Sequence, residues 1–546
     1  MTRGRTQTDE GLAGVAPAAE VAADTAPAKA PATGTAAGTA PTAGATTAGA
    51  AAGGEPAGKA PAAGTADKLR DVAFAAVVGV FAGLAAVLLS VVVAWMEGVH
   101  AANHLTTVVL PLLAVAEVAL YRALKVPFGT STASILAKCR AGELPSWKVA
   151  PAIFLGTTAT IAGGGSVGKE AAALQMGAGV SAALVGLRDR WRARRACSAA
   201  GASVKTAVRA AGGAAQAPAA QAAGSGAGQA FAAPAPADAE SVRMLLVAGM
   251  AGGFASLMFA PFAAAVFVLE IARLHRDQLR DLRILCVPVA AGCAYAVAEL
   301  FGVGRMWVPP AVVPPADQVA LEVGLVSALC AFAGLAFTVL LKLVRTAAST
   351  FVTNPFVRTI AGAVIVMTAL VLPDAQVASG TGMGLIELAI GGGAVGAWDF
   401  AWKFALTIAC LAFGLKGGEI MPVLCVGACL GSTLGTVTGT APDFMAGVGM
   451  VALFAACGRC PIAAFLLGVE AFGPAGAAAY AVAAALGLVA GWHMSLYDSS
   501  TWVLKLPWTG SFGESEEPVP QEPSREPARL RDWEQGTTAQ PLRRRR

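Results

Sequence analysis

The sequence Gly163-Gly164-Gly165-Ser166-Val167-Gly168-Lys169-Glu170 decides how the rest of the chain is interpreted. Uncharged residues fill positions 149–167 before Lys169, and 171–187 after Glu170. The first run is long enough to cross about 30 Å of hydrocarbon as a helix that rises 1.5 Å per residue. Glu170 therefore opens a predicted helix within the membrane. A carboxylate there costs at least ~2.5 kcal/mol by insertion scales, so a sequence keeps one mainly where it is paired or has a function.

Two roles for Glu170 are compatible with this position. It can form a salt bridge with Lys169 or act as a negative charge at a helix N-terminus. It can also act as a gate, because backbone N–H groups exposed by the preceding glycines form a positive helix end that binds an anion. The carboxylate can then occupy the place of the anion. Protonation would release it, which would couple anion passage to pH or to proton movement.

The same stretch reproduces most of a phosphate-binding loop, since Gly163 and Gly168-Lys169 have the required spacing. In such a loop the next residue is a Ser or Thr that ligates Mg²⁺, and this chain has Glu170 there. The preceding segment is a lipid-length apolar run instead of a short strand. The sequence therefore argues against nucleotide hydrolysis.

The composition extends this interpretation to the whole chain. Of 546 residues, 56% are hydrophobic and only 13% are charged, which leaves too few polar side chains to coat a soluble globule. We expect an all-α integral membrane protein. Shorter, glycine-rich runs are expected to be tilted, partial or re-entrant helices, which need cover from protein or a water-filled cavity. Further runs of spanning length are 72–96, 149–168, 244–269, 323–341, 420–442 and 471–497, and the shorter runs are 171–187, 404–415 and 444–458.

The chain divides into one predicted membrane domain, 69–506, and three other segments. Residues 1–68 are an Ala/Gly/Pro/Thr tract without the apolar core of a cleavable signal peptide, and we expect them and the tail 507–546 to be disordered. Residues 189–240 are predicted to be a low-complexity loop insertion. Arginines cluster at 188–195, 273–283 and 543–546, so the positive-inside bias predicts that both termini are cytoplasmic, in a plasma membrane. Trp191 is the one Phe, Tyr or Trp residue within these clusters, too few for a stacking platform, so no nucleic-acid partner is expected.

A second glycine-rich stretch, Gly414-Leu415-Lys416-Gly417-Gly418, lies in the second half of the chain. Paired glycine interruptions in corresponding positions of two halves are typical of broken helices around a binding site at the membrane midplane.

Cysteines lie mostly in apolar segments, where thiols behave as small hydrophobes. Cys457 and Cys460 have the spacing of half a zinc site, but no second pair or suitable histidine follows, so packing is the interpretation. No metal and no cofactor is expected.

Further stretches of the sequence are Ala260-Pro261-Phe262 leading to Glu270, Gly417-Gly418-Glu419-Ile420-Met421-Pro422, Gly449-Met450-Val451, and Ser495-Leu496-Tyr497. Together with Gly168-Lys169-Glu170-Ala171-Ala172, these motifs resemble those of the CLC family of chloride channels and anion/proton antiporters. The likeness covers about residues 70–506 with the motifs in the family's order, and it implies two inverted halves, tilted helices and a homodimer with one pore per subunit. It also implies transport of chloride or fluoride, with protons in the exchangers.

The resemblance also implies the residues of the site. Glu170 is the external gating glutamate. Glu419 is either a second gating or proton-handling residue or a helix N-terminal charge that faces solvent. The predicted anion-binding residues are Gly129, Thr130, Ser131, Gly168, Lys169, Gly418, Ile420, Met421 and Tyr497. The family's usual proline is absent after Ser131. Taken alone, Tyr497 would be an interfacial anchor of the aromatic belt, and the family register makes it an anion contact instead.

Departures from the family pattern bear on mechanism. The inner proton-handling glutamate of typical exchangers would follow Glu270, and this chain has Ile271 there. Either the protein is an uncoupled conductor or protons move through Glu170 itself. Glu270 is interpreted as a structural residue at a helix end. Glu419 resembles the fluoride-exporting branch, whereas Met421 replaces the threonine usual in that branch. Because fluoride requires strong hydrogen-bond donors, chloride is the favoured anion and fluoride/proton antiport is the alternative.

Two other classes of membrane protein are an intramembrane protease and a passive channel. An intramembrane protease would need a Ser–His or paired-aspartate arrangement within the helices, and the apolar runs offer none, so the chain is not expected to be an enzyme. A passive channel is distinguished from an exchanger by its reversal potential under a pH gradient.

Overall fold

The computed structural model describes residues 64–211, 238–302, 310, 312–315 and 317–498. Of the segments predicted to be disordered, 1–63, 212–237 and the tail 507–546 lie outside the described residues. Within the described residues the elements are helices, and the one pair of β-bridge residues belongs to no strand. The predicted all-α class is confirmed.

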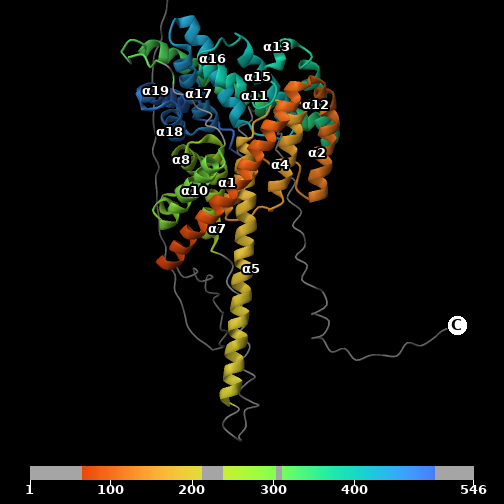
Figure 1. Ribbon diagram of the computed structural model, residues 1–546, viewed down its shortest axis with the longest axis vertical. Coiled ribbons are helices and arrows are strands. Elements are labelled where there is room, and N and C mark those ends of the chain that lie inside the picture. The colour runs from red at the N-terminus through yellow and green to blue at the C-terminus, as the bar shows by residue number, and fades with distance from the viewer. Residues whose placement is uncertain (1–63, 212–237, 303–309, 311, 316, 499–546) are drawn as a thin grey trace, which may run out of the picture. The chain divides into compact units, whose positions relative to one another are not determined.

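The helices fall into two series that follow each other along the chain (Figure 1). The first series consists of α1 (Thr65–Ala102), η1 (His104–Val109), α2 (Leu110–Leu124), α3 (Thr132–Ala141), α4 (Val149–Ala162), α5 (Glu170–Ala211), α7 (Ala239–Met258), α8 (Pro261–Ala272), α9 (Arg276–Leu279), η3 (Leu282–Leu285) and α10 (Cys286–Leu300). The second consists of α11 (Ala320–Phe351), α12 (Pro355–Ala369), α13 (Pro373–Gln376), α14 (Met383–Ile390), α15 (Asp399–Phe413), α16 (Ile420–Thr438), α17 (Pro442–Gly458), α18 (Pro461–Phe472), η4 (Pro474–Gly476) and α19 (Ala477–Ala490).

The two series repeat one packing scheme. In the first, a Cβ atom on Gly177 of α5 would lie 2.0 Å from the carbonyl oxygen of Gly249 on α7. In the second, a Cβ atom on Gly427 of α16 would lie 2.7 Å from the carbonyl oxygen of Gly449 on α17. Both crossings therefore require glycine, and both bring two helix backbones into direct contact, as small residues do in membrane helix pairs. The chain is built from two structurally corresponding halves.

Several long apolar runs are not single helices, which corrects the sequence-based lengths. Run 244–269 breaks after Met258, because Phe259 adopts a left-handed conformation (φ 51°) and Pro261 starts α8. Run 471–497 breaks at Gly473 (φ 90°), which Pro474 follows. Run 149–168 ends its helix at Ala162, and 163–169 forms a loop. Among the described residues, seven helices are long and apolar enough to cross a membrane, and several shorter apolar helices have 10–17 residues.

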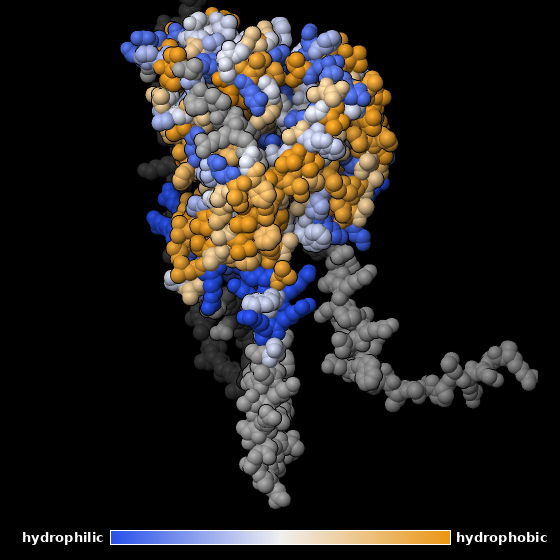
Figure 2. Space-filling model, in the orientation of Figure 1, coloured by the Kyte–Doolittle hydropathy of each residue, from blue (hydrophilic) through white to orange (hydrophobic). Residues whose placement is uncertain are grey.

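One run departs in the opposite direction. Run 171–187 was expected to be a partial helix, but 170–195 belongs to one of the helices of spanning length, and α5 continues to Ala211 through part of the predicted loop 189–240. Figure 2 shows hydrophobic residues over the flank of the helix bundle and hydrophilic residues where α5 leaves it. The exposed side chains of Leu88, Leu112 and Phe332 suit contact with lipid.

Charged residues at one face of the bundle connect elements far apart in sequence. The Asp71 carboxylate, near the start of α1, binds Arg188 of α5 at 2.9 Å and Arg283 of η3 at 3.0 Å. Arg283 also binds Asp238, just before α7, at 2.9 Å. Arg188 and Arg283, which come from two of the three arginine clusters in the sequence, therefore lie at the same face.

Candidate functional site

The two glycine-rich loops meet between the halves. The N–H of Gly168 donates to the carbonyl oxygen of Gly418 at 2.6 Å, and the N–H of Gly418 donates back to Gly168 at 2.7 Å. A Cβ atom on Gly418 would lie 2.8 Å from Cβ of Ala171, so the second loop also abuts the first turn of α5. The N-termini of α5 and α16 are thus joined at one place. The paired interruptions predicted from sequence are adjacent in the structure.

Glu170 lies at this junction and is fully buried. Its Oε2 accepts a hydrogen bond from the N–H of Lys169 at 3.1 Å, and its Oε1 has no hydrogen-bond partner among the residues that the structure describes. A Cβ atom on Gly168 would lie 2.9 Å from Glu170 Oε2 and 2.9 Å from Cβ of Met421. The carboxylate therefore lies beside the first turn of α16 as well as at the start of its own helix. Both helix ends carry partial positive charge, which favours an anionic group there.

Lys169 does not pair with this carboxylate through its side chain. Its ammonium group donates to the hydroxyl of Ser90 on α1 at 2.9 Å. The salt bridge considered from the sequence is therefore not what holds Glu170. Lys169 instead fixes the loop 163–169 to α1.

A third helix N-terminus converges on the site. Gln175, in the second turn of α5, donates from Nε2 to the hydroxyl of Thr132, the first residue of α3, at 3.1 Å. Gln175 is 4% exposed, and its Oε1 has no partner. Thr130 donates to the carbonyl oxygen of Pro127 at 2.8 Å, and Ser131 caps α3 by accepting from the N–H of Ser134 at 3.3 Å. Nearest α5, the α3 end therefore presents Thr132, which the sequence analysis did not single out.

Gly129 is exposed in the loop before α3, where a Cβ atom would meet nothing within 4 Å. The structure thus places Gly129, Thr130 and Ser131 just before α3. The hydroxyls of Thr130 and Ser131 already form hydrogen bonds with residues nearby in the sequence. Their assignment as anion contacts stays a prediction.

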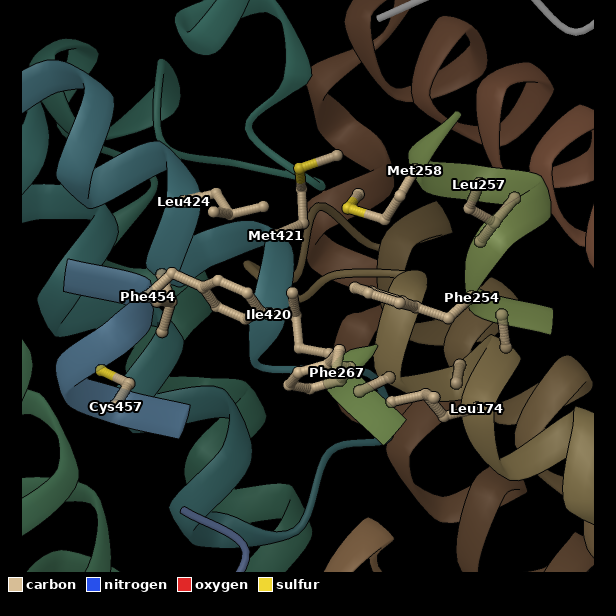
Figure 3. Packing of buried hydrophobic residues seen from close by; sticks show 14 of the residues in the cluster. Leu174, Phe254, Leu257, Met258, Phe267, Ile420, Met421, Leu424, Phe454 and Cys457 are labelled. Carbon is tan, nitrogen blue, oxygen red and sulfur yellow. The ribbon is translucent and has the colours of Figure 1, made fainter. Parts of the chain in front are cut away.

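Apolar side chains of the first turn of α16 lie beside the junction. Ile420 and Met421 are 1% and 0% exposed, and Figure 3 shows them with Phe254, Phe267 and Phe454 between the two halves. The rings of Phe267 and Phe454 lie 5.2 Å apart, centroid to centroid. Ile420 and Met421 therefore offer no side-chain hydrogen-bond donor at this point.

Tyr497 closes the same cluster. Its ring is 2% exposed and makes an edge-to-face contact with Phe267, with centroids 5.8 Å apart. This burial does not fit an interfacial anchor, whose ring would face the lipid headgroups. Tyr497 belongs to the interior, beside the helix that carries Phe267.

Two glutamates bind the helix ends of the opposite half. Glu270, at the end of α8, accepts from the N–H groups of Ile462 and Ala463 at the start of α18, at 3.2 and 2.8 Å. Glu470, at the end of α18, accepts from Phe262 and Ala263 at the start of α8, at 3.1 and 2.7 Å. Glu270 is a reciprocal helix cap, as expected of a structural residue. The neighbouring Ile271 is 3% exposed and packed in the core.

Glu117 of α2 supports the second glycine loop. It is 1% exposed, and its carboxylate accepts from the Thr160 hydroxyl at 2.6 Å and from the N–H of Lys416 at 3.1 Å. The Lys416 ammonium donates to the carbonyl oxygen of Phe128 and lies 3.8 and 4.5 Å from the ring centroids of Phe128 and Tyr121. These contacts fix the backbone that carries Gly418.

A pocket of about 480 Å³ lies near the first glycine loop and is lined by Glu97, His100 and His104, among others. Gly164 packs against His100, since a Cβ there would lie within 2.4 Å of the imidazole. One peptide group of the pocket wall binds two charges: the carbonyl oxygen of Gly380 accepts from Lys403 at 2.7 Å, and the N–H of Thr381 donates to Glu97 at 2.6 Å.

Glu419 immediately precedes α16 and is partly buried, and its side chain makes no cap hydrogen bond to that helix.

Cys457 and Cys460 are 1% and 0% exposed, with their thiols directed at the carbonyl oxygens of Gly334 and Phe454. Within the described residues, no group of three or more His, Cys, Asp or Glu side chains is arranged to hold a metal ion.

Sequence reasoning missed Thr132, Gln175, Glu117 and Lys403 as contributors to this region. Glu117 and Lys403 carried a usable signal, because each is a charged residue within an otherwise apolar run. Thr132 and Gln175 carried none, since a single hydroxyl or amide in a helix is common and only the fold brings the two together.

The comparisons with known proteins bear directly on this geometry. Residues 114–215 and 210–491 match the profile of the family described as voltage gated chloride channel. The chain belongs to the voltage gated chloride channel family. It is 28% identical over 264 residues to a chloride/fluoride channel protein of Pseudomonas syringae pv. tomato, an alignment that covers 47% of this chain and 58% of that relative.

Solved structures of the CLC fold superpose on the chain. A CLC-type fluoride/proton antiporter gives a TM-score of 0.67 at 20% identity, covering 80% of this chain and 98% of that one. A slow cyanobacterial Cl−/H+ antiporter gives 0.59 at 18% identity, covering 77% and 94%. A eukaryotic CLC transporter gives 0.54 at 17% identity, covering 79% and 73%. At these identities the likeness shows the fold, which is that of the CLC membrane domain, with two halves joined at the glycine loops.

Proposed function

We propose that this chain moves a small inorganic anion, most favourably chloride, across the plasma membrane, with Glu170 as its gate. The observation that carries the proposal is the position of the Glu170 carboxylate, fully buried where two helix N-termini meet and with Oε1 unpartnered.

In the proposed mechanism the carboxylate and the transported anion compete for one place. While Glu170 is ionised, its charge satisfies the positive ends of α5 and α16. An anion that displaces it, or a proton that neutralises it, moves the side chain out of the way. Because Glu170 begins its helix, a change of side-chain rotamer suffices and the helix itself need not move.

Chloride is favoured by the walls of the site. Ile420, Met421 and Phe267 contribute carbon and thioether surface, and they are buried. Fluoride is small and strongly hydrated, so its dehydration must be offset by strong donors, whereas chloride tolerates apolar contacts. Thr132 and Gln175 supply hydroxyl and amide groups at the α3 end, which suffices for a weakly hydrated anion.

Fluoride/proton antiport is the second candidate, and Glu419 is the observation that favours it. A carboxylate directly before α16 can act as an inner gate or a proton site. The relative from Pseudomonas syringae carries both halides in its name, and one superposed structure is a fluoride/proton antiporter. A route for protons that uses Glu170 and Glu419 would not need a carboxylate at Ile271.

The basic face containing Arg188 and Arg283 supports the proposed orientation. Both arginines bind Asp71 near the start of α1, so the ends of several elements carry positive charge on one side. By the positive-inside bias this side is cytoplasmic, and so are both termini. A homodimer is proposed, in which each subunit contains a complete site, since both glycine loops come from one chain.

The test is anion release from liposomes that contain purified protein and are loaded with KCl or KF. Valinomycin starts the release, ion-selective electrodes record it, and a protonophore separates proton-coupled from uncoupled flux. Wild type is compared with Glu170→Ala, and Glu387→Ala on α14 is the control, because it also removes a carboxylate from a described helix.

Faster chloride than fluoride release that changes with Glu170→Ala, and not with the control, supports the proposal. Fluoride release with proton uptake supports the second candidate. If folded, dimeric protein releases neither halide, the proposed transport function is wrong even though the fold is that of the family.

A further inference from the structure

The segment 495–498 lies under the aromatic cluster and is bound to α17 at several points. Ser495 donates from its hydroxyl to the carbonyl oxygen of Gly458 at 3.0 Å, and the N–H of Leu496 donates to the carbonyl oxygen of Cys457 at 3.0 Å. The N–H of Tyr497 donates to the Ser495 hydroxyl oxygen at 3.2 Å. The Tyr497 ring therefore reaches Phe267 from a short segment that lies outside any helix.

Asp498 fixes the end of this segment by charge. Its carboxylate, 7% exposed, contacts the guanidinium groups of Arg273 and Arg459, the latter at 3.7 Å. Arg273 directly follows α8 and Arg459 directly follows α17, so one carboxylate links the ends of two helices from opposite halves. The carbonyl oxygen of Asp498 also lies 3.5 Å from the ammonium of Lys342 on α11.

Both arginines have left-handed backbones, with φ of 52° at Arg273 and 54° at Arg459. Among described residues other than glycine, only Lys125 and Phe259 share this conformation. Left-handed backbone is unfavourable for a side chain with a Cβ and persists where surrounding contacts maintain it. Glycine would relieve this strain at either position but would remove the guanidinium group.

The internal repeat does not reproduce the pair of arginines that binds Asp498. Phe259 follows α7 as Arg459 follows α17, and Gly473 follows α18 as Arg273 follows α8. The two positions that correspond to the arginines, Phe259 in the first half and Gly473 in the second, thus carry a phenyl ring and a hydrogen instead of guanidinium groups. The overall repeat is kept in the glycine crossings and glutamate caps, and it is broken where Asp498 binds.

We propose that Asp498 is a positioning residue that holds Tyr497 at the inner mouth of the anion path by binding Arg273 and Arg459. This inference rests on the proposed anion transport and on Tyr497 as an anion contact. Without the Asp498 charge the segment 495–498 keeps its hydrogen bonds to α17 but loses its link to α8. The Tyr497 ring then shifts relative to Phe267, and the mouth no longer discriminates well between anions of different size.

The first measurement is hydrogen–deuterium exchange on purified protein, which is independent of transport. Asp498→Asn should accelerate exchange of the peptide that contains Leu496 and Tyr497 by roughly fivefold, with α19 and α1 unchanged. Asp281→Asn is the matched control, because Asp281 also pairs with a cation, Lys68 at 2.8 Å, but makes no contact with the 495–498 segment. Should Asp498→Asn not fold, Arg459→Gln weakens the same link while leaving Arg273 in place.

The second measurement is the ratio of chloride to fluoride release in liposomes, which does not depend on the amount of active protein. Asp498→Asn and Tyr497→Ala should each shift this ratio several-fold in the same direction, and the double variant should shift it no further. Asp498→Glu should restore much of the wild-type ratio. Loss of folded protein alone would lower both rates together.

Unchanged exchange at 495–498 overturns the positional role of Asp498. Accelerated exchange with an unchanged halide ratio overturns its effect on the anion path. A wild type that carries neither halide contradicts the proposed function, and the exchange measurement still decides whether Asp498 holds Tyr497.

Discussion

Glu170 combines complete burial with a carboxylate oxygen that has no partner among the described residues, which is costly for the ionised group and typical of a functional one. Ionised, the carboxylate competes with anions for the positive helix ends. Protonated, it loses that attraction. Anion transport is therefore expected to rise as the pH falls, and Glu170→Gln, which resembles the protonated form, should be fast and independent of pH.

The measurement is the initial rate of chloride release from liposomes between about pH 4.5 and 7.5, a range that spans ordinary and moderately raised carboxyl pKa values. Wild type and Glu170→Gln are compared at each pH. A wild-type rate that falls with acidification, or a variant that keeps the wild-type profile, would refute the gating role.

Thr160 and Thr158 offer a matched pair on α4. The Thr160 hydroxyl donates to Glu117 at 2.6 Å, whereas the Thr158 hydroxyl donates within its own helix to Phe154 at 2.8 Å. Thr160→Val should leave the buried carboxylate short of a partner and weaken its hold on Lys416, at a cost of about 1–3 kcal/mol. Thr158→Val should cost much less.

Thermal unfolding in detergent and chloride flux per folded protein test this difference. Thr160→Val is expected to lower both, because the loop that carries Gly418 depends on Glu117. Equal effects of the two substitutions would mean that the Glu117 contact does not position the loop.

At the scale of helices, the reciprocal caps make a second prediction. Glu270→Gln and Glu470→Gln each replace a charge-assisted cap by a weaker neutral one, so each should lower stability by about 0.5–2 kcal/mol. Neither should change the number of protons moved per anion, because both carboxylates are engaged by helix N–H groups.

Melting temperature and the ratio of proton to anion flux are the readouts, with Glu143→Gln before α4 as an exposed control. A changed flux ratio in Glu270→Gln alone would show that this residue handles protons despite its cap geometry. Similar loss of stability in both variants is the expected result.

The sequence predicted the presence of two halves and the meeting of their glycine loops, because unusual residues in matching places carry strong information. It did not predict where helices end within apolar runs. Phe259 and Gly473 terminate helices through backbone conformation, and an apolar residue such as Phe259 gives no local sign of this. Hydropathy describes how well a residue suits lipid, and it carries no information about whether the helix backbone is continuous. The uncharged run 244–269 therefore gives no sign of its break after Met258.

The candidate site likewise contains residues that the sequence could predict and residues that it could not. Glu170, Gly168 and Gly418 could be identified because a charge and paired glycines are conspicuous in apolar sequence. Thr132 and Gln175 could not, since their contact at 3.1 Å depends on how α3 packs against α5. Contacts between distant segments are products of the fold, and one hydroxyl among many carries no local mark.

At the scale of the whole molecule, Arg188 and Arg283 both bind Asp71, and we predict that this face of the protein is cytoplasmic. Trypsin should cut after the arginines at 188–195 only when the cytoplasmic face is accessible, as in inside-out vesicles. Intact spheroplasts should protect these sites. Cleavage in spheroplasts and protection in inverted vesicles would reverse the proposed orientation.

The central claim is that Glu170 occupies the place of the transported anion between the halves. The most direct measurement is anomalous diffraction from crystals of wild type and Glu170→Ala grown with bromide in place of chloride. In Glu170→Ala we expect a bromide peak beside Gly168 and the first turn of α16, at the position of the wild-type carboxylate, and no peak there in wild type. A well-ordered variant without bromide at that position, or bromide bound there beside the intact Glu170 carboxylate, would contradict it.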